Sequence, residues 1–171
     1  MEPIRELIAV DLEMTGLQVK TDRILEIGAV RLVDGQLRDT FQTFVNPHRR
    51  IDARITELTG IRPEMVENAP EAEDALQKFL EFAGEAPFLG HNVIFDYSFL
   101  KQCAVNHKIS LERSALDTLK IARKVLKEPE KKSLEALCGY FQIDREHAHR
   151  AVDDAKATAE LFLMLQQKYQ Q

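Results

Sequence analysis

The sequence has only two cysteines, no apolar run long enough to cross a membrane and no excess of positive charge. Cys103 and Cys138 both fall in helical patterns, so a disulfide framework is not expected and a reducing cytoplasm fits. The missing apolar run argues against a membrane protein. The first residues mix both charge signs, which does not resemble a signal peptide. We therefore expect a cytoplasmic protein with no membrane contact.

The charge balance limits how the chain could bind nucleic acid. There are 23 basic and 28 acidic residues, a net charge of −5. This argues against coating a nucleic acid through a broad basic surface, but it leaves local binding of a strand end open. Two divalent ions would neutralise four of these five negative charges. An acidic composition can also simply favour solubility, and that reading needs no metal.

The length of 171 residues suits one domain, residues 1–171, with a substantial core. The apolar patterns predict strands at residues 5–11, 24–33, 37–45, 87–90 and 115–116, and helices at residues 52–59, 71–83, 96–107, 118–126, 133–141 and 150–168. A meander of three strands followed by strands that alternate with helices is typical of an α/β domain with a mixed central sheet.

Two carboxylates end the first predicted strand. Asp11 and Glu13 follow an apolar run and are two residues apart, so in an extended strand their side chains project from the same face. Paired acids at the end of a buried strand are expensive unless a cation or a proton is present. The pair therefore indicates a site for hard divalent metal ions, and the alternative is a strand end with two solvated acids.

Two further acids fall on apolar helix faces. Asp96 shares a face with Phe99, Leu100 and Cys103, which favours a functional acid over a simple helix cap. In the last helix, a rotation of about 100° per residue places Asp154 on the inward face and Asp153 toward water. Asp154 is thus the better candidate of the two.

His149 lies five residues before Asp154 and could reach the same pocket, where it would titrate near neutral pH. A histidine near a helix start is more often structural, and the nearby acids are what raise its interest. His147 and His149 could also be considered as zinc ligands, but no nearby pair of cysteines completes a set.

Two other acids are interpreted as structural. Glu26 falls in the middle of an apolar strand, where we expect it to bind backbone groups or an arginine. Asp117 precedes a predicted helix and is expected to cap it.

Taken together, three segments resemble a known family. Asp11-Leu12-Glu13, His91-Asn92-Val93-Ile94-Phe95-Asp96 and His149-Arg150-Ala151-Val152-Asp153-Asp154-Ala155 resemble, in order and spacing, the three motifs of the DEDDh (DnaQ-like) 3′–5′ exonucleases. Residues 55–61 resemble a segment that many members carry between the first two motifs. Within the family, the resemblance is to the epsilon proofreading subunit of bacterial DNA polymerase III and to the exonuclease region of PolC-type polymerases.

The resemblance implies a ribonuclease-H-like fold, in which helices flank a mixed five-stranded sheet. It implies a metal-dependent enzyme that hydrolyses single-stranded DNA from its 3′ end to nucleoside 5′-monophosphates, in proofreading or repair. Two Mg²⁺ ions are the implied cofactors, and Mn²⁺ should substitute. A DNA polymerase is a possible partner.

The resemblance also implies roles for individual residues. The metal-binding acids would be Asp11, Glu13, Asp96 and Asp154, with His149 as the general base. The terminal nucleotide would contact Met14, Thr15, Gly16 and Leu17, with the backbone and Thr15 near its 3′ hydroxyl and Leu17 against its base; His91, Asn92 and Phe95 would line the groove. Thr59 stands where some epsilon-type members have histidine, which puts a substrate contact there in doubt.

Several alternatives stay open. The first motif also resembles that of oligoribonucleases, so a 3′–5′ exoribonuclease is the second enzyme reading, and no contact to a 2′ hydroxyl can be recognised in a sequence. A non-catalytic binding domain and a hydrolase of small nucleotides are further possibilities. Two basic groups, Arg49, Arg50, Arg54 and Arg62 and then Lys124, Lys127, Lys131 and Lys132, could hold phosphates, but we interpret them as solvated faces.

Overall fold

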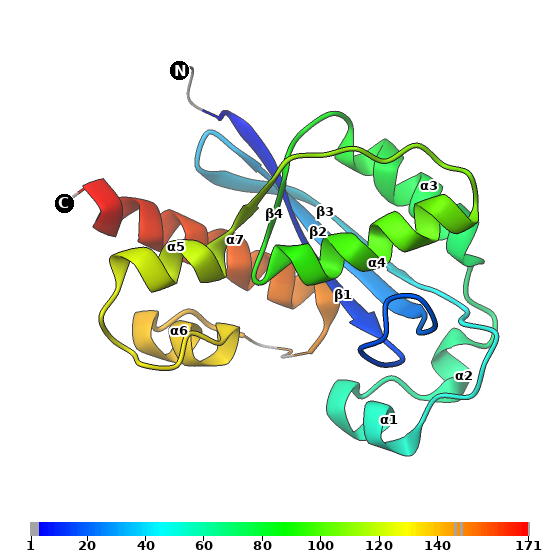
Figure 1. Cartoon of the computed structure of the whole chain (residues 1–171). Helices are drawn as coiled ribbons and strands as arrows, with labels where there is room; N and C mark the ends of the chain where they lie inside the picture. Colours follow the sequence, from blue (N-terminus) through cyan, green and yellow to red (C-terminus); the bar gives the residue numbers. More distant parts are fainter. Residues whose placement is uncertain (1–3, 146, 148, 171) are drawn as a thin grey trace.

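A mixed sheet forms the centre of the molecule (Figure 1). The computed structural model describes residues 4–145, 147 and 149–170. Its five strands are β1 (Glu6–Met14), β2 (Ile24–Val33), β3 (Gln36–Phe44), β4 (Phe88–Gly90) and β5 (Ala115–Asp117), in the order β3-β2-β1-β4-β5. β1, β2 and β3 are antiparallel neighbours, whereas β4 and β5 run parallel to β1. The predicted five-stranded sheet with its three-stranded meander is confirmed.

The helices lie close to the predicted positions. They are α1 (Ala53–Thr59), α2 (Pro63–Val66), α3 (Ala72–Ala83), α4 (Val93–Asn106), α5 (Thr118–Val125), α6 (Leu134–Phe141) and α7 (Ala151–Gln170). Only the four-residue α2 was not predicted, and it begins at a proline, a residue suited to the first helical position. α4 begins at Val93, before the predicted start, so Asp96 lies in its first turn.

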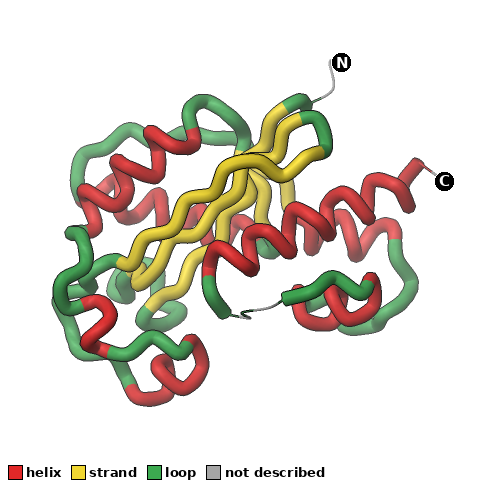
Figure 2. Tube along the Cα trace, turned by 180° about the vertical axis from the view of Figure 1, so that it is seen from behind, coloured by secondary structure: helices red, strands yellow, loops and turns green. Residues whose placement is uncertain are grey.

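Two layers of helices cover the sheet. α3 and α4 lie on one face, and α7 lies across the other with α5 and α6 beside it, as the front and back views show (Figures 1 and 2). α1 and α2 lie near the carboxyl end of β1. Each face of the sheet therefore has its own apolar core.

Alternation along β1 decides where its acids point. Ile8, Val10 and Leu12 pack in the core under α3 and α4, whereas Leu7 and Ala9 pack under α7. Because side chains two residues apart share a face, Asp11 and Glu13 continue the α7 side. The strand was predicted to end at residue 11, but its pairing with β2 continues to the Glu13–Glu26 pair, which keeps both acids in one extended segment.

A glycine on β2 lets α7 approach the sheet closely. Gly28 pairs with Asp11, and a Cβ atom added there would lie 2.1 Å from the backbone nitrogen of Val152. No side chain could fit between the two backbones at this point. The first turn of α7 is therefore held directly beside the carboxylates of β1.

Candidate active site

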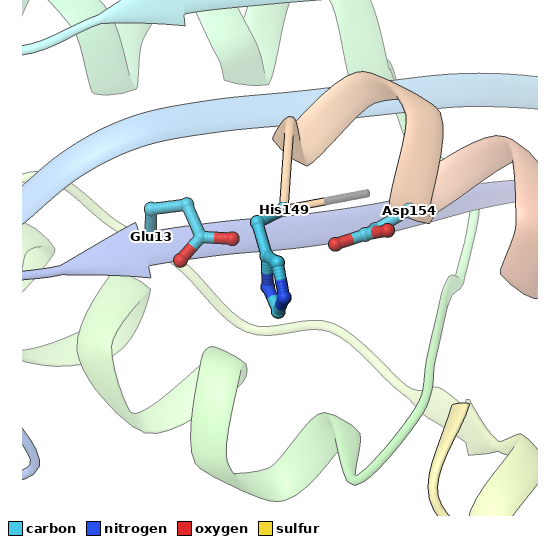
Figure 3. Close-up of side chains that lie close together, drawn as sticks. All are labelled: Glu13, His149 and Asp154. Atoms are coloured by element: carbon cyan, nitrogen blue, oxygen red, sulfur yellow. The ribbon is translucent and has the colours of Figure 1, made fainter. Parts of the chain in front are cut away.

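Three side chains from distant parts of the chain meet where α7 begins. Glu13 comes from β1, Asp154 from the first turn of α7 and His149 from the segment just before it (Figure 3). One ligand atom of each lies within 4.8 Å of the others. The predicted inward position of Asp154 is confirmed by its exposure of 5%, and Asp153 is more exposed. Among the described residues, Glu13, His149 and Asp154 thus form a group whose ligand atoms are close enough together to hold one metal ion.

Asp11 and Asp96 join this group electrostatically. Burial raises the pKa of Asp11 well above its ordinary value, and the carboxylates of Asp96 and Glu13 raise it further. Burial and then Glu13 act in the same way on the pKa of Asp96. For Glu13, burial followed by Asp154 raises the pKa to about 8. Burial and mutual repulsion thus favour the protonated forms of Asp11, Glu13 and Asp96.

One oxygen of this group has no hydrogen-bond donor. The Asp11 Oδ2 atom is buried and lacks a partner among the described residues. Buried carboxylate oxygens are almost always satisfied by a donor or a cation, so an orphan at the centre of an acidic cluster fits a site for a cation. Oxygen-rich donor sets suit hard divalent ions such as Mg²⁺ and Mn²⁺.

Asp154 has a counter-ion that the sequence did not indicate. Arg145 donates to Asp154 Oδ1 from Nε at 3.1 Å and from Nη2 at 2.8 Å. Both are largely buried, with 12% of the Arg145 side chain and 7% of the Asp154 side chain exposed. The guanidinium neutralises one of the four acids, and it takes a position at Oδ1 that a metal ligand would need.

Glu26 is fully buried on β2 directly across from Glu13. It accepts a hydrogen bond from the Ala151 N–H at 2.8 Å and another from Gln42 at 3.0 Å, and Arg150 lies 3.8 Å away. The predicted structural role of Glu26, binding backbone groups or an arginine, is confirmed. Glu26 holds the first residue of α7 beside the site.

The carboxylate of Asp117 joins two helix starts. It accepts from the N–H of Leu119, which confirms the predicted cap of α5, and also from the N–H of Asn92 before α4. Asn92 has a left-handed backbone with φ of 61°. This link fixes the start of α4, and therefore Asp96, relative to the end of β5.

A pocket of about 370 Å³ opens beside Glu13. One wall is the turn after β1, and the other is α1; its lining consists of Glu13, Met14, Thr15, Gly16, Leu17, Asp52, Arg54, Ile55, Leu58 and Thr59. Among these residues, Leu17 and Leu58 are 76% and 59% exposed, so their side chains are accessible to a molecule in the pocket. The pocket thus places the Glu13 carboxylate next to apolar side chains such as Leu17 and Leu58.

The turn after β1 is shaped by an aspartate that sequence reasoning missed. Asp22 accepts from Thr15 Oγ1 at 2.9 Å and from the Gln18 N–H at 2.9 Å. A Cβ added to Gly16 would lie 2.4 Å from Asp22 Oδ2. The Thr15 hydroxyl in turn accepts from the Arg23 N–H, so one carboxylate holds the whole turn. Its spacing seven residues after Thr15, in a polar loop, gave no periodic signal.

The other residues assigned to the groove lie outside this pocket's lining. His91 places Nδ1 2.8 Å from the Thr118 hydroxyl and Nε2 2.7 Å from the carbonyl of Lys132. Both ring nitrogens are therefore used in bracing α5 and the segment before α6. Phe95 is half-buried and packs edge-on against Phe99.

Thr59 is buried and makes internal bonds. Its hydroxyl donates to the Ile55 carbonyl and accepts from the Ile61 N–H. The Thr59 hydroxyl is therefore already used within the protein, in agreement with the doubt about a substrate contact from this side chain.

The comparisons with known proteins agree with this geometry. A family model described as an exonuclease, RNase_T, matches residues 8–162. The chain belongs to this exonuclease family. The family predicted from the three motifs is thereby confirmed. In the structure, the acids of the three motifs lie on β1, α4 and α7.

The chain resembles one segment of a much longer curated relative. It is 44% identical over 166 residues to the PolC-type DNA polymerase III of Caldanaerobacter subterraneus subsp. tengcongensis, covering 97% of this chain and 12% of that protein. The chain thus spans about an eighth of the length of this relative.

Solved structures share its fold. Exonuclease X in complex with 5′ overhanging duplex DNA superimposes with a TM-score of 0.77 at 25% identity, covering 96% of this chain and 93% of that one. Escherichia coli exonuclease I in complex with a dT13 oligonucleotide gives a TM-score of 0.84 at 17% identity, covering 97% and 42%. The predicted ribonuclease-H-like fold is confirmed.

The remaining features of the chain are less specific. Arg50, Arg54 and Arg62 are exposed, in line with a solvated face. Cys103 and Cys138 are free thiols. None of the helices in the described part of the chain combines the length and the hydropathy that crossing a bilayer requires.

Proposed function

We propose that this chain is a metal-dependent 3′–5′ exonuclease that removes nucleoside 5′-monophosphates from the 3′ end of single-stranded DNA. The observation that carries the proposal is the buried Asp11 Oδ2 atom, which no described residue hydrogen-bonds, within a cluster of four acids. Such a cluster has little use in a domain that only binds, because its mutual repulsion destabilises the fold. Membership of an exonuclease family supports the reaction class.

Two Mg²⁺ ions are the proposed cofactors, with Mn²⁺ as a substitute. Asp11, Glu13, Asp96 and Asp154 are the proposed ligands, since Asp96, Glu13 and Asp154 all act electrostatically on the buried Asp11 carboxylate and all four offer oxygen donors. When bound, a pair of divalent ions would lower the pKa of the attacking water and stabilise the leaving oxygen. Binding would also relieve the repulsion among the acids.

His149 is the proposed general base. It is exposed, and a ligand atom of its ring lies within 4.8 Å of Glu13 and Asp154 oxygens. A ring nitrogen would take the proton from the attacking water as the phosphodiester bond breaks. Its exposure allows the proton to pass on to solvent.

The pocket beside Glu13 is the proposed site of the 3′-terminal nucleotide. Leu17 and Leu58 would lie against the base, and the Thr15–Gly16 turn would face the sugar. The Thr15 hydroxyl already donates to Asp22 and accepts from Arg23, so it can offer a further lone pair to a 3′ hydroxyl but no proton to a 3′ phosphate. This arrangement supports action on 3′-hydroxyl ends.

Residues 1–171 would act as one exonuclease domain, and a DNA polymerase is the proposed partner. Likeness to part of a PolC-type polymerase supports this association. That likeness and the free cysteines support a cytoplasmic location.

Digestion of oligonucleotides labelled at either end tests the direction, the metal requirement and the sugar preference. With Mg²⁺ or Mn²⁺, we expect 5′-labelled DNA to shorten gradually and 3′-labelled DNA to release a mononucleotide at once, with EDTA stopping both. A competing RNA of equal length decides the sugar preference, and preferred cleavage of RNA would replace DNA as the substrate. Absence of cleavage with either metal would refute the proposal.

Substitutions separate the roles. His149→Ala should lower kcat by at least about 10² while metal binding persists, with His147→Ala, at an exposed residue, as control.

Asp154→Ala should lose metal affinity and activity together, with Asp153→Ala as control. Calorimetry with Mn²⁺ measures the binding, and normal affinity in Asp154→Ala would refute its ligand role.

A further inference from the structure

His149 has a backbone conformation that side chains rarely adopt. Its φ of 69° lies in the left-handed region, and His149 is not a glycine. Such conformations persist where surrounding contacts hold them, and they gather at functional sites. Identifying what holds His149 therefore bears directly on how its ring is aimed.

The next residue supplies that contact. Arg150 donates to the carbonyl of His149 from Nη2 at 3.1 Å and from Nε at 3.3 Å. The same Nη2 donates to the carbonyl of Thr59 at 2.7 Å. One guanidinium thus joins the segment before α7 to the end of α1, two parts of the chain that are 91 residues apart.

The guanidinium is itself fixed in place. Its Nε lies 3.8 Å from Glu26 Oε1, and its central carbon lies 5.6 Å from the centre of the Phe44 ring. Glu26 is buried and already holds the N–H of Ala151. Arg150 therefore lies between a buried carboxylate and an aromatic ring, and its fork cannot swing away without losing both.

We propose that Arg150 is a positioning residue that acts through His149. It fixes the His149 carbonyl, and with it the left-handed backbone that directs the imidazole toward Glu13 and Asp154. This inference rests on the proposed function, because it assigns Arg150 a part in aligning the general base. Arg150 is not itself one of the grouped acids and histidine or one of the pocket-lining residues, and its contact with the pocket is the hydrogen bond to the backbone carbonyl of Thr59.

The geometry requires arginine rather than any cation. A planar fork reaches two carbonyls and stacks on a ring at the same time, whereas an ammonium group is a single point charge. Arg150→Lys keeps a positive charge near buried Glu26, so the fold is protected, but it loses the fork. Arg150→Gln serves as a second variant, because it removes the charge as well.

Arg113 offers a matched control. It also donates to a backbone carbonyl, that of Ala86 at 2.9 Å, and its central carbon lies 5.1 Å from the centre of the Phe88 ring. It lies toward the amino ends of β4 and β5, away from the acids. Arg113→Lys therefore removes the same kind of interaction without touching His149.

The first test does not depend on activity. Protein labelled with ¹⁵N-histidine gives amide signals for its five histidines, and His149→Ala identifies the signal of residue 149. We expect Arg150→Lys and Arg150→Gln to shift or broaden that signal, and Arg113→Lys to leave it unchanged. A His149 signal at the wild-type position in both Arg150 variants overturns the inference, whether or not the wild type cleaves DNA.

The second test is a double-mutant cycle. Arg150→Lys should lower kcat about 10-fold to 100-fold with KM little changed, because α1 keeps its own Asp52 and Gly60 caps. In the His149→Ala background, Arg150→Lys should lower kcat no further. An equal loss in both backgrounds overturns the inference. Inactive wild-type protein refutes the proposed function instead, and the amide signals then decide this inference alone.

Discussion

The two faces of the sheet are packed by different chemistry. Under α3 and α4 the core is made of large side chains such as Phe79, Leu76 and Phe88. Under α7 the helix contributes small residues, among them Ala155 and Ala159. Large side chains give one face its apolar burial, whereas small ones let α7 approach the strands until carboxylates from both meet. The first face therefore stabilises a fold whose second face gathers mutually repelling acids.

Emptying the large-residue face should have the greatest effect on stability. Phe79 is fully buried, with its ring centre 5.9 Å from that of Phe41 and 5.6 Å from that of Phe88. Phe79→Ala should lower the free energy of unfolding by about 3–5 kcal/mol, while the folded fraction still binds Mn²⁺. Urea denaturation measures this. The control is Val105→Ala, at a residue 60% exposed on α4.

Crowding the small-residue face should cost less stability and more function. Gly28→Ala places a methyl group against the backbone of Val152 and pushes α7 outward. We expect a loss of about 1–3 kcal/mol from overpacking. Activity should fall by about 10² or more, because Asp154 and His149 move with α7. In Gly139→Ala, on α6, the new methyl meets nothing within 4 Å, so wild-type activity is expected. Equal behaviour of the two variants in denaturation and cleavage assays would contradict this account of α7.

Removing the positive charge of Arg145 should strengthen metal binding by the acids beside α7. Arg145 donates twice to Asp154 Oδ1, so it would compete with the proposed metal ions for this oxygen. Arg145→Gln should therefore bind Mn²⁺ about tenfold more tightly, a difference of about 1.4 kcal/mol. Calorimetry provides the measurement, with Arg5→Gln, at an exposed pair with Asp34, as control. Weaker binding in the variant would show that Arg145 supports the site rather than competing.

The smallest effect expected is a pH dependence confined to metal-free protein. Burial raises the pKa of Glu13 from 4.5 to about 8, so its protonated form favours the folded state. The resulting stability is complete below pH 4.5 and is lost as the pH rises through 8. In EDTA, Tm should fall by roughly a few degrees between pH 6 and pH 9. Mn²⁺ should remove the fall, and Glu13→Gln should reduce it, because the pKa values of Asp11 and Asp96 are also raised. A Tm that stays level in EDTA would argue against the repulsion.

Periodicity made much of the fold and the acid set predictable. The alternation in β1 and the helical spacing around Asp154 are local, because each depends only on residues a few positions apart. The contacts of Arg145, Arg150 and Asp22 could not be predicted in the same way. Arginine and aspartate in loops have no periodic partner, and their targets are selected by where the chain folds back.

By itself, the sequence determined the mixed sheet, the helices and the acids on inward faces, because these follow from backbone geometry repeated along short segments. The tertiary structure alone decided that Glu26 and Gly28 seat α7, that Arg145 neutralises Asp154 and that Arg150 holds His149. These contacts depend on groups from different elements reaching the same few ångströms, and only the packed chain sets those positions.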